Sequence, residues 1–301
     1  MKPPRCCRSR TPSRTAGPVA AALLLGRGAL GASSGPCECL NWRRSYEAGV
    51  IKCGEGLELY FASNRTNLSK WELWDVSSLF HETCYSLYQR IDHSGCLNIR
   101  RGASPDAGWD AGLWCYVRGE CRSLGGGHAV VSRGLLWSAP RGVSWKVCRP
   151  GEDASLRGLG PAALLARARA WAAGVAPGQP PLDLSGLARQ AWLSLRPQLW
   201  WHVEGAWLAG NHTALPPALR ATLASGEGMV LDVAEHRRGD AVVLFGAQTW
   251  QLRHDPGACP DTTFCLSCLG GGCPEEPLRP EPEAPAGARP PPPPTPGAGE
   301  L

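Results

Sequence analysis

His202, Glu204, Asp232 and His236 are the residue types that acid–base or metal-assisted hydrolysis needs. His202 and Glu204 lie in a Trp-rich segment, and Asp232 and His236 lie near the end of a β-rich one. If the chain folds one segment back on the other, the four side chains form a His/carboxylate site. The alternative is that they are surface or hydrogen-bonded residues. Because the sequence has no H-E-x-x-H, G-x-S-x-G or phosphate-loop motif, it favours a protein that is not an enzyme and holds no cofactor or metal.

Cysteine is the second reactive residue type, and eight of the fourteen cysteines lie in one window of the first half. An even number of cysteines in a window the size of a small secreted domain predicts a disulfide framework. The sequence does not determine which cysteines pair with which. The eight are Cys37, Cys39, Cys53, Cys84, Cys96, Cys115, Cys121 and Cys148.

Four further cysteines, Cys259, Cys265, Cys268 and Cys273, lie close together near the end of the chain. Four thiolates around zinc are one interpretation, since Cys265 and Cys268 have Cys-x-x-Cys spacing. Structural zinc sites usually have two such pairs, however, and this cluster has one. The sequence therefore favours two local disulfides.

Tryptophans flank the half-cystines at the end of the first window. The sequence contains Ser104-Pro-Asp106, Trp114-Cys115-Tyr116 and Trp145-x-x-Cys148. A Trp beside a half-cystine supplies packing that a small core otherwise lacks. In these motifs Ser104–Cys148 resembles the kringle and fibronectin type II modules of extracellular proteins.

The kringle resemblance implies that Asp106, Trp114 and Tyr116 bind a cationic ligand such as a lysine side chain, with a carboxylate for the ammonium and aromatic walls for the stem. Carbohydrate stacked on exposed indoles such as Trp109 or Trp137 is a related interpretation. The alternative, which we favour, is that Trp114 and Tyr116 only pack the disulfide.

The chain departs from those modules at three places: the extra Cys121, the upstream Cys37-Glu-Cys39 pair and a helix that carries Cys84. Taken whole, the window 37–148 looks more like uncharacterised secreted Cys-rich proteins of microbial algae. That resemblance implies that the protein is secreted, but it implies no particular activity.

Apolar periodicity and turn residues indicate the elements that must position these side chains. Helices are expected over 77–91, 161–173, 182–195 and 217–225, and strands over 57–62, 142–147, 229–234 and 241–252. The expected parts are a signal peptide (1–31), a disulfide-rich Cys/Trp module (37–148), a linker (149–158), an α+β domain (159–258), a Cys-rich knuckle (259–273) and a disordered Pro-rich tail (274–301). The fold class is thus a small disulfide-rich α+β module, then an α+β domain and a disordered tail.

The first residues set the expected compartment. They hold six of the 31 basic residues and no acidic one, followed by an apolar run too short to span a bilayer. Removal of this leader leaves a nearly neutral chain with no basic block, so nucleic acid is not expected as a partner. No later run has membrane length. The glycosylation sequons at Asn64, Asn67 and Asn211 agree with secretion.

We therefore predict a secreted, Cys-rich glycoprotein that acts as an extracellular binding or interaction module for a carbohydrate or protein ligand. One alternative is a secreted hydrolase that uses the His/carboxylate set. Another is a structural matrix or wall protein.

Overall fold

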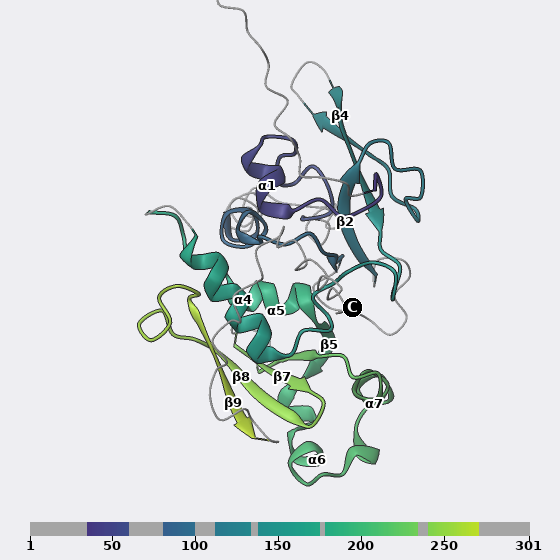
Figure 1. Cartoon of the computed structure of the whole chain (residues 1–301). Coiled ribbons are helices and arrows are strands. Elements are labelled where there is room, and N and C mark those ends of the chain that lie inside the picture. The colour runs from purple at the N-terminus through teal and green to yellow at the C-terminus, as the bar shows by residue number, and fades with distance from the viewer. Residues whose placement is uncertain are drawn as a thin grey trace, which may run out of the picture. The chain divides into compact units, whose positions relative to one another are not determined.

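The computed structural model describes residues 35–59, 81–99, 112–133, 138–174, 178–233 and 240–270. All of them belong to one compact unit, Gly35–Leu301. They form two β-sheets and several helices, which Figure 1 traces in order along the chain. The expected leader (1–31) and tail (274–301) lie outside the described residues.

The first sheet is antiparallel and has the strand order β1-β2-β4-β3. Its strands are β1 (Leu97–Asn98), β2 (Leu113–Arg118), β3 (Ala129–Arg133) and β4 (Ser138–Val147). The strand expected over 142–147 lies within β4. A Cβ atom at Gly127 would be 2.0 Å from the carbonyl oxygen of Trp145, so only glycine fits where the loop before β3 crosses β4.

Short helical turns accompany this sheet. Helix α1 (Trp42–Glu47) begins after Asn41, whose side chain accepts a hydrogen bond from the Arg44 N–H. The long helix expected over 77–91 is, in its described part, two separate turns, η1 (His81–Tyr85) and η2 (Tyr88–Arg90). Leu87 breaks the helix, because its φ of −126° and ψ of −81° lie outside the helical region.

The second half begins with helices α4 (Pro161–Ala173) and α5 (Leu184–Ala191). The helix expected over 182–195 ends at Ala191, because the next residues pair with another strand as β5 (Leu193–Leu199). Four short helices follow β5: η4 (Trp200–His202), α6 (Glu204–Leu208), η5 (His212–Ala214) and α7 (Pro217–Ala224).

The second sheet has the strand order β5-β6-β7-β8-β9, with β5 and β6 parallel and the other pairs antiparallel. Its later strands are β6 (Met229–Asp232), β7 (Ala241–Phe245), β8 (Gln248–His254) and β9 (Phe264–Gly270). The strand expected over 241–252 is two strands, because Gly246 adopts a φ of 57° and turns the chain.

The knuckle expected over 259–273 is, in its described part, an edge of this sheet. Cys265 and Cys268 lie on β9, where they pair with Arg253 and Trp250 of β8. Phe264 and Leu266 alternate inward on the same strand and are buried. Burial of this apolar face therefore incorporates the cysteine segment into the sheet.

One hydrophobic core crosses the boundary that the sequence places at 149–158. A single cluster of buried side chains runs from Trp42 in the first half to Leu266 in the second. Within the expected linker, Leu156 is fully buried and Ser155 forms a β-bridge with Cys96. The segment is thus folded against both halves because Leu156 lies in their shared core. In the described ranges no helix combines the length and apolar character needed to cross a bilayer.

Candidate functional site

Five disulfides are present among the described residues. They join Cys37 to Cys121, Cys39 to Cys115, Cys53 to Cys84, Cys96 to Cys148, and Cys259 to Cys265. The last of these pairs two members of the second cysteine cluster, so a four-thiolate zinc site there does not form. Cys268 is a half-cystine as well.

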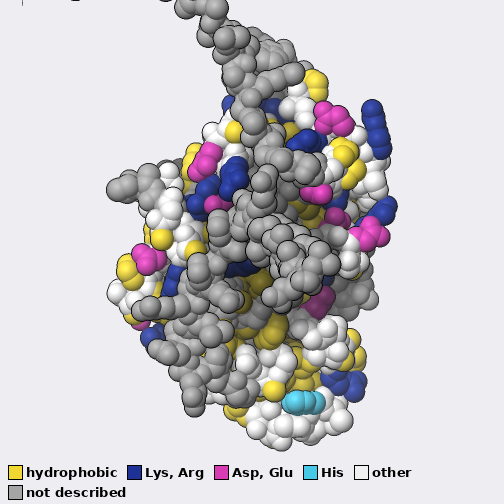
Figure 2. Space-filling view, in the orientation of Figure 1, with side chains coloured by type: hydrophobic (Ala, Val, Ile, Leu, Met, Phe, Trp, Pro, Cys, Tyr) yellow, Lys and Arg dark blue, Asp and Glu magenta, His cyan; other side chains and the backbone are white. Residues whose placement is uncertain are grey.

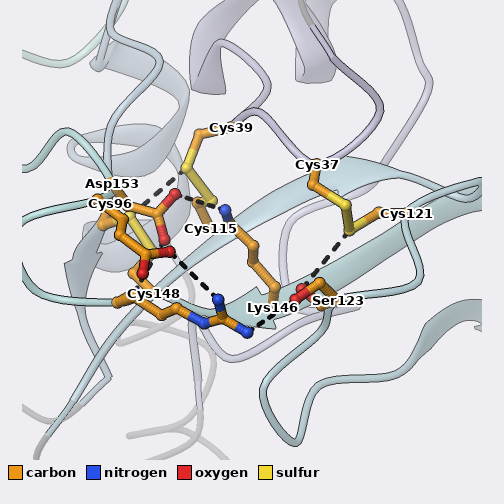
Figure 3. A network of polar contacts seen from close by, with 11 residues as sticks. Cys37, Cys39, Cys96, Cys115, Cys121, Ser123, Lys146, Cys148 and Asp153 are labelled. Atoms are coloured by element: carbon orange, nitrogen blue, oxygen red, sulfur yellow. Dashed lines mark hydrogen bonds and ion pairs between the residues drawn. A yellow bond between two sulfur atoms is a disulfide. The ribbon is translucent and has the colours of Figure 1, made fainter.

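Two of these disulfides lie against each other. The Sγ atoms of Cys39 and Cys96 are 3.5 Å apart. The four sulfurs of Cys39, Cys115, Cys96 and Cys148 all lie within 4.8 Å of one another. Figure 3 shows this sulfur cluster beside the side chain of Lys146.

An open cleft of about 320 Å³ borders the same region. We call it the Lys146 cleft; its lining residues are Gly35, Pro36, Cys37, Glu38, Ser123, Lys146, Val147, Arg149, Glu152 and Asp153. The residues come from the start of the described chain, from the loop after β2, from the end of β4 and from the segment after it. The fold therefore brings together parts of the chain that are more than a hundred residues apart.

Hydrogen bonds already connect the charged groups of the cleft (Figure 3). The Lys146 ammonium donates to Asp153 Oδ1 over 2.5 Å, and the backbone N–H of Arg149 donates to Asp153 Oδ2 over 2.8 Å. The Arg149 guanidinium donates to Glu152 over 3.2 Å and to the Ser123 hydroxyl over 3.0 Å. Lys146 is nearly buried, whereas Arg149 and Glu152 are exposed. The cleft thus offers fixed donors and acceptors of both signs.

Nothing in the sequence pattern distinguishes Lys146 as a site residue. Lys146 lies within the motif Trp145-Lys-Val-Cys148, but the motif does not predict that the lysine lines a binding site. The register of the sheet reveals it, because Lys146 lies directly opposite Cys115 on the neighbouring strand.

Glu58 is a second residue that sequence reasoning missed. Its side chain is 1% exposed, and it accepts hydrogen bonds from the hydroxyls of Tyr46 (2.7 Å) and Tyr116 (2.6 Å) and from the Gly56 N–H (3.0 Å). Burial raises the pKa of Glu58, and the two phenol hydrogen bonds offset part of that rise. Burial and the neighbouring carboxylate also raise the pKa of Tyr46 and of Tyr116. No strand forms over 57–59, the described part of the expected strand 57–62, where Glu58 is directed inward to these donors.

Trp114 and Tyr116 do not form a ligand pocket. Both are buried, and their rings make edge contacts with Trp42 at centroid distances of 4.9 and 5.4 Å. The structure therefore places both in the core, where the Tyr116 hydroxyl donates to Glu58. Asp106 and Trp109, the other residues expected to bind a ligand, lie outside the described residues, as does Trp137.

Of the His/carboxylate set, His202 and Asp232 come from neighbouring strand ends, because Leu199, three residues before His202, pairs with Asp232. His202 and Glu204 are exposed on the turns after β5, and the His202 Nδ1 accepts a hydrogen bond from the Leu199 N–H. Asp232 forms an ion pair of 2.5 Å with the buried Arg189. The Asp232 carboxylate is therefore already paired with a buried guanidinium. His236 lies outside the described residues.

One tryptophan is exposed where the others are buried. Of the nine tryptophans in the described residues, eight are at most 8% exposed, whereas Trp201 is 62% exposed. Its ring lies 3.7 Å from that of His202, centroid to centroid. Trp201 thus offers an indole face to solvent.

The described sequon is accessible. Asn211 is exposed before η5, and its side-chain oxygen accepts a hydrogen bond from the Thr213 hydroxyl over 2.8 Å. Asn64 and Asn67 lie outside the described residues.

Nothing among the known protein families, the curated proteins or the solved structures matches this chain. The resemblance to kringle and fibronectin type II modules accordingly remains a prediction.

Proposed function

We propose that this protein is a secreted carbohydrate-binding protein and that the Lys146 cleft is its binding surface. The disulfides support an oxidising compartment, since such bonds persist mainly in secreted and luminal proteins. The volume of about 320 Å³ is at the lower end of the range of roughly 300–1,000 Å³ for small-ligand sites. The cleft therefore suits one or two sugar residues better than a protein surface.

The pairing of charges in the cleft is the observation that carries this proposal. Lys146 and Arg149 are each hydrogen-bonded to a carboxylate, so neither cation is available to hold a strongly anionic ligand. A sugar hydroxyl donates and accepts at once, and it can therefore bridge a carboxylate and a guanidinium that are held side by side. On the face drawn in Figure 2, the visible basic and acidic side chains of the described residues are interspersed. A neutral polyhydroxyl ligand fits such a lining.

Apolar groups complete the proposed site. Pro36 and Val147 line the cleft beside the charged groups and can cover the C–H face of a sugar ring. The exposed indole of Trp201 is a second candidate surface, because aromatic faces supply large apolar contact at low conformational cost.

Replacement of Arg149 by alanine tests the cleft. We expect Arg149→Ala to weaken binding of a glycan identified on an array by about tenfold, because one charge-assisted hydrogen bond contributes about 1.4 kcal/mol or more. Isothermal titration calorimetry measures the change. The melting temperature should shift by no more than a few degrees, because the Arg149–Glu152 pair is exposed and such pairs stabilise little.

Arg220→Ala is the matched control, because Arg220 is also exposed but lies on α7 and does not line the cleft. Equal affinities of the two variants would place binding elsewhere. If Trp201→Ala alone abolished binding, the exposed indole would be the binding surface and the cleft proposal would be wrong. An array without a single bound glycan would rule out the carbohydrate function.

The other two functions have less support. A hydrolase that uses His202, Glu204, Asp232 and His236 needs Asp232 to leave Arg189, and His202 does not line the Lys146 cleft. A matrix or wall role depends on the segment 274–301, which lies outside the described residues. The kringle-like lysine site would need Trp114 and Tyr116 at the surface.

A further inference from the structure

The packed pair of disulfides has the composition of a metal site. Cys39, Cys96, Cys115 and Cys148 bring four sulfurs within 4.8 Å of one another. Four thiolates in a tetrahedron are the donor set that structural zinc prefers, at Zn–S distances of about 2.3 Å. That geometry separates the sulfurs of a zinc site by about 3.8 Å.

Small movements convert one arrangement into the other. Once both disulfides are reduced, the sulfurs of each former pair must separate to about 3.8 Å, a displacement of roughly 1 Å for each atom. The contact between Cys39 and Cys96 is already 3.5 Å. The Cα atoms of the two disulfide pairs are 5.6 and 6.4 Å apart, so side-chain rotation can supply the change.

The backbone holds the four cysteines independently of the disulfides. The N–H of Cys96 donates to Ala154, and the N–H of Cys148 donates to Leu113, each over 2.8 Å. Cys115 is paired with β4 in the middle of β2. Leu40, next to Cys39, donates to the Tyr116 carbonyl over 2.7 Å. The four Cα positions should therefore persist after reduction.

The surroundings suit a tetrathiolate. Cys96, Cys115 and Cys148 are buried and Cys39 is partly exposed, which leaves one side for a metal ion to enter. Lys146 shares a sheet face with Cys115, since the two are direct cross-strand partners. Its ammonium lies near the sulfurs in Figure 3, where it is paired with Asp153.

We propose that Cys39, Cys96, Cys115 and Cys148 are a redox-dependent zinc site, with two disulfides in the oxidised protein and one Zn²⁺ held by four thiolates in the reduced protein. Reduction of each disulfide by a dithiol yields two thiols and one oxidised dithiol. Zinc then binds the four thiolates, and four protons leave. This inference goes beyond carbohydrate binding and does not depend on it.

Zinc content of the reduced full-length protein tests the proposal. The protein is reduced without oxygen by a phosphine, which becomes phosphine oxide and takes its oxygen from water. It is then loaded with ZnCl₂ and freed of excess metal by gel filtration. We expect the zinc content of Cys96→Ser/Cys148→Ser to be lower than that of wild type by one ion per chain. Cys37→Ser/Cys121→Ser, which removes a disulfide outside the cluster, should keep wild-type content.

Cobalt absorption spectra and melting temperatures of the wild-type protein test the proposal without relying on the folding of any variant. In reduced wild type, Co²⁺ should give an intense thiolate-to-metal charge-transfer band, which zinc abolishes, and zinc should raise the melting temperature. Equal zinc content in wild type and Cys96→Ser/Cys148→Ser would overturn the proposal. So would a reduced wild type that binds no zinc, or one whose melting temperature zinc leaves unchanged.

Discussion

Glu58→Leu is expected to lower the free energy of unfolding by about 3–5 kcal/mol, because it leaves three buried donors without an acceptor and each costs about 1–3 kcal/mol. The donors are the hydroxyls of Tyr46 and Tyr116 and the Gly56 N–H. Urea unfolding followed by near-ultraviolet circular dichroism measures the loss. Glu204→Leu makes the same change at an exposed position and should alter stability by about 0.5 kcal/mol at most.

Glu58 also makes a specific pH dependence. Because burial raises its pKa in the folded protein above the ordinary value of 4.5, the folded state keeps a proton that the unfolded chain has lost. Stability from this group is therefore complete below pH 4.5 and is lost as the pH rises through the folded pKa. Glu58→Gln cannot titrate, so the difference in stability between wild type and Glu58→Gln should fall with rising pH. A difference that is constant, or that grows with pH, would contradict the raised pKa.

Asn98→Leu is expected to cost about 3–5 kcal/mol and to destabilise both halves of the protein together. Asn98 is buried on β1 and donates to the carbonyls of Arg189 and Trp192 over 2.9 and 2.8 Å. Its side-chain oxygen accepts from the Arg157 guanidinium over 2.9 Å. Leucine removes the donors and the acceptor while keeping a similar volume.

Hydrogen exchange followed by mass spectrometry distinguishes a shared loss from a local one. Peptides from β2 and from β7 should lose protection at the same urea concentration in wild type, and at the same lower concentration in Asn98→Leu. Asn211→Leu, at an exposed position, should behave as wild type. Separate transitions for β2 and β7 would show that the halves are independent domains, which the shared core argues against.

The sequence predicted the disulfide-rich character and the mixture of helix and strand, because cysteine number and apolar periodicity are local properties. The sequence did not predict that the two halves share one hydrophobic core. The segment 149–158 has the Pro, Gly and charged residues of a linker, yet Asp153 and Arg157 hydrogen-bond to the buried Lys146 and Asn98. Leu156 anchors it in the core, and one leucine among ten residues gives no periodic signal.

The end of α5 shows a similar limit. Residues 193–195 continue the apolar pattern of the helix, yet they form β5, because Leu193 and Ser194 pair with Met229 and Val230 on β6. A partner strand more than thirty residues away decides that outcome, and helix propensity is too weak to resist it.

The candidate site depended on pairings that the sequence left open. Lys146 and Cys115 face each other only because β2 and β4 are neighbours in one register. The sulfur cluster likewise requires two particular disulfides among many combinations. The four residues of the alternative hydrolase site share only suitable residue types, and the sequence does not reveal that Asp232 forms an ion pair with Arg189.

The five disulfides among the described residues have a consequence for synthesis. Four close within Cys37–Cys148 and one within Cys259–Cys265, so all of them lie to one side of Leu156 or the other. The first half can therefore complete its oxidation before the second half leaves the ribosome. Asn98 cannot form its hydrogen bond to the Trp192 carbonyl until 94 further residues have been synthesised. At a synthesis rate of about 5–20 residues per second, this takes about 5–20 s. During that interval a growing chain whose first half is already oxidised exposes an unfinished apolar face, which a chaperone would have to cover.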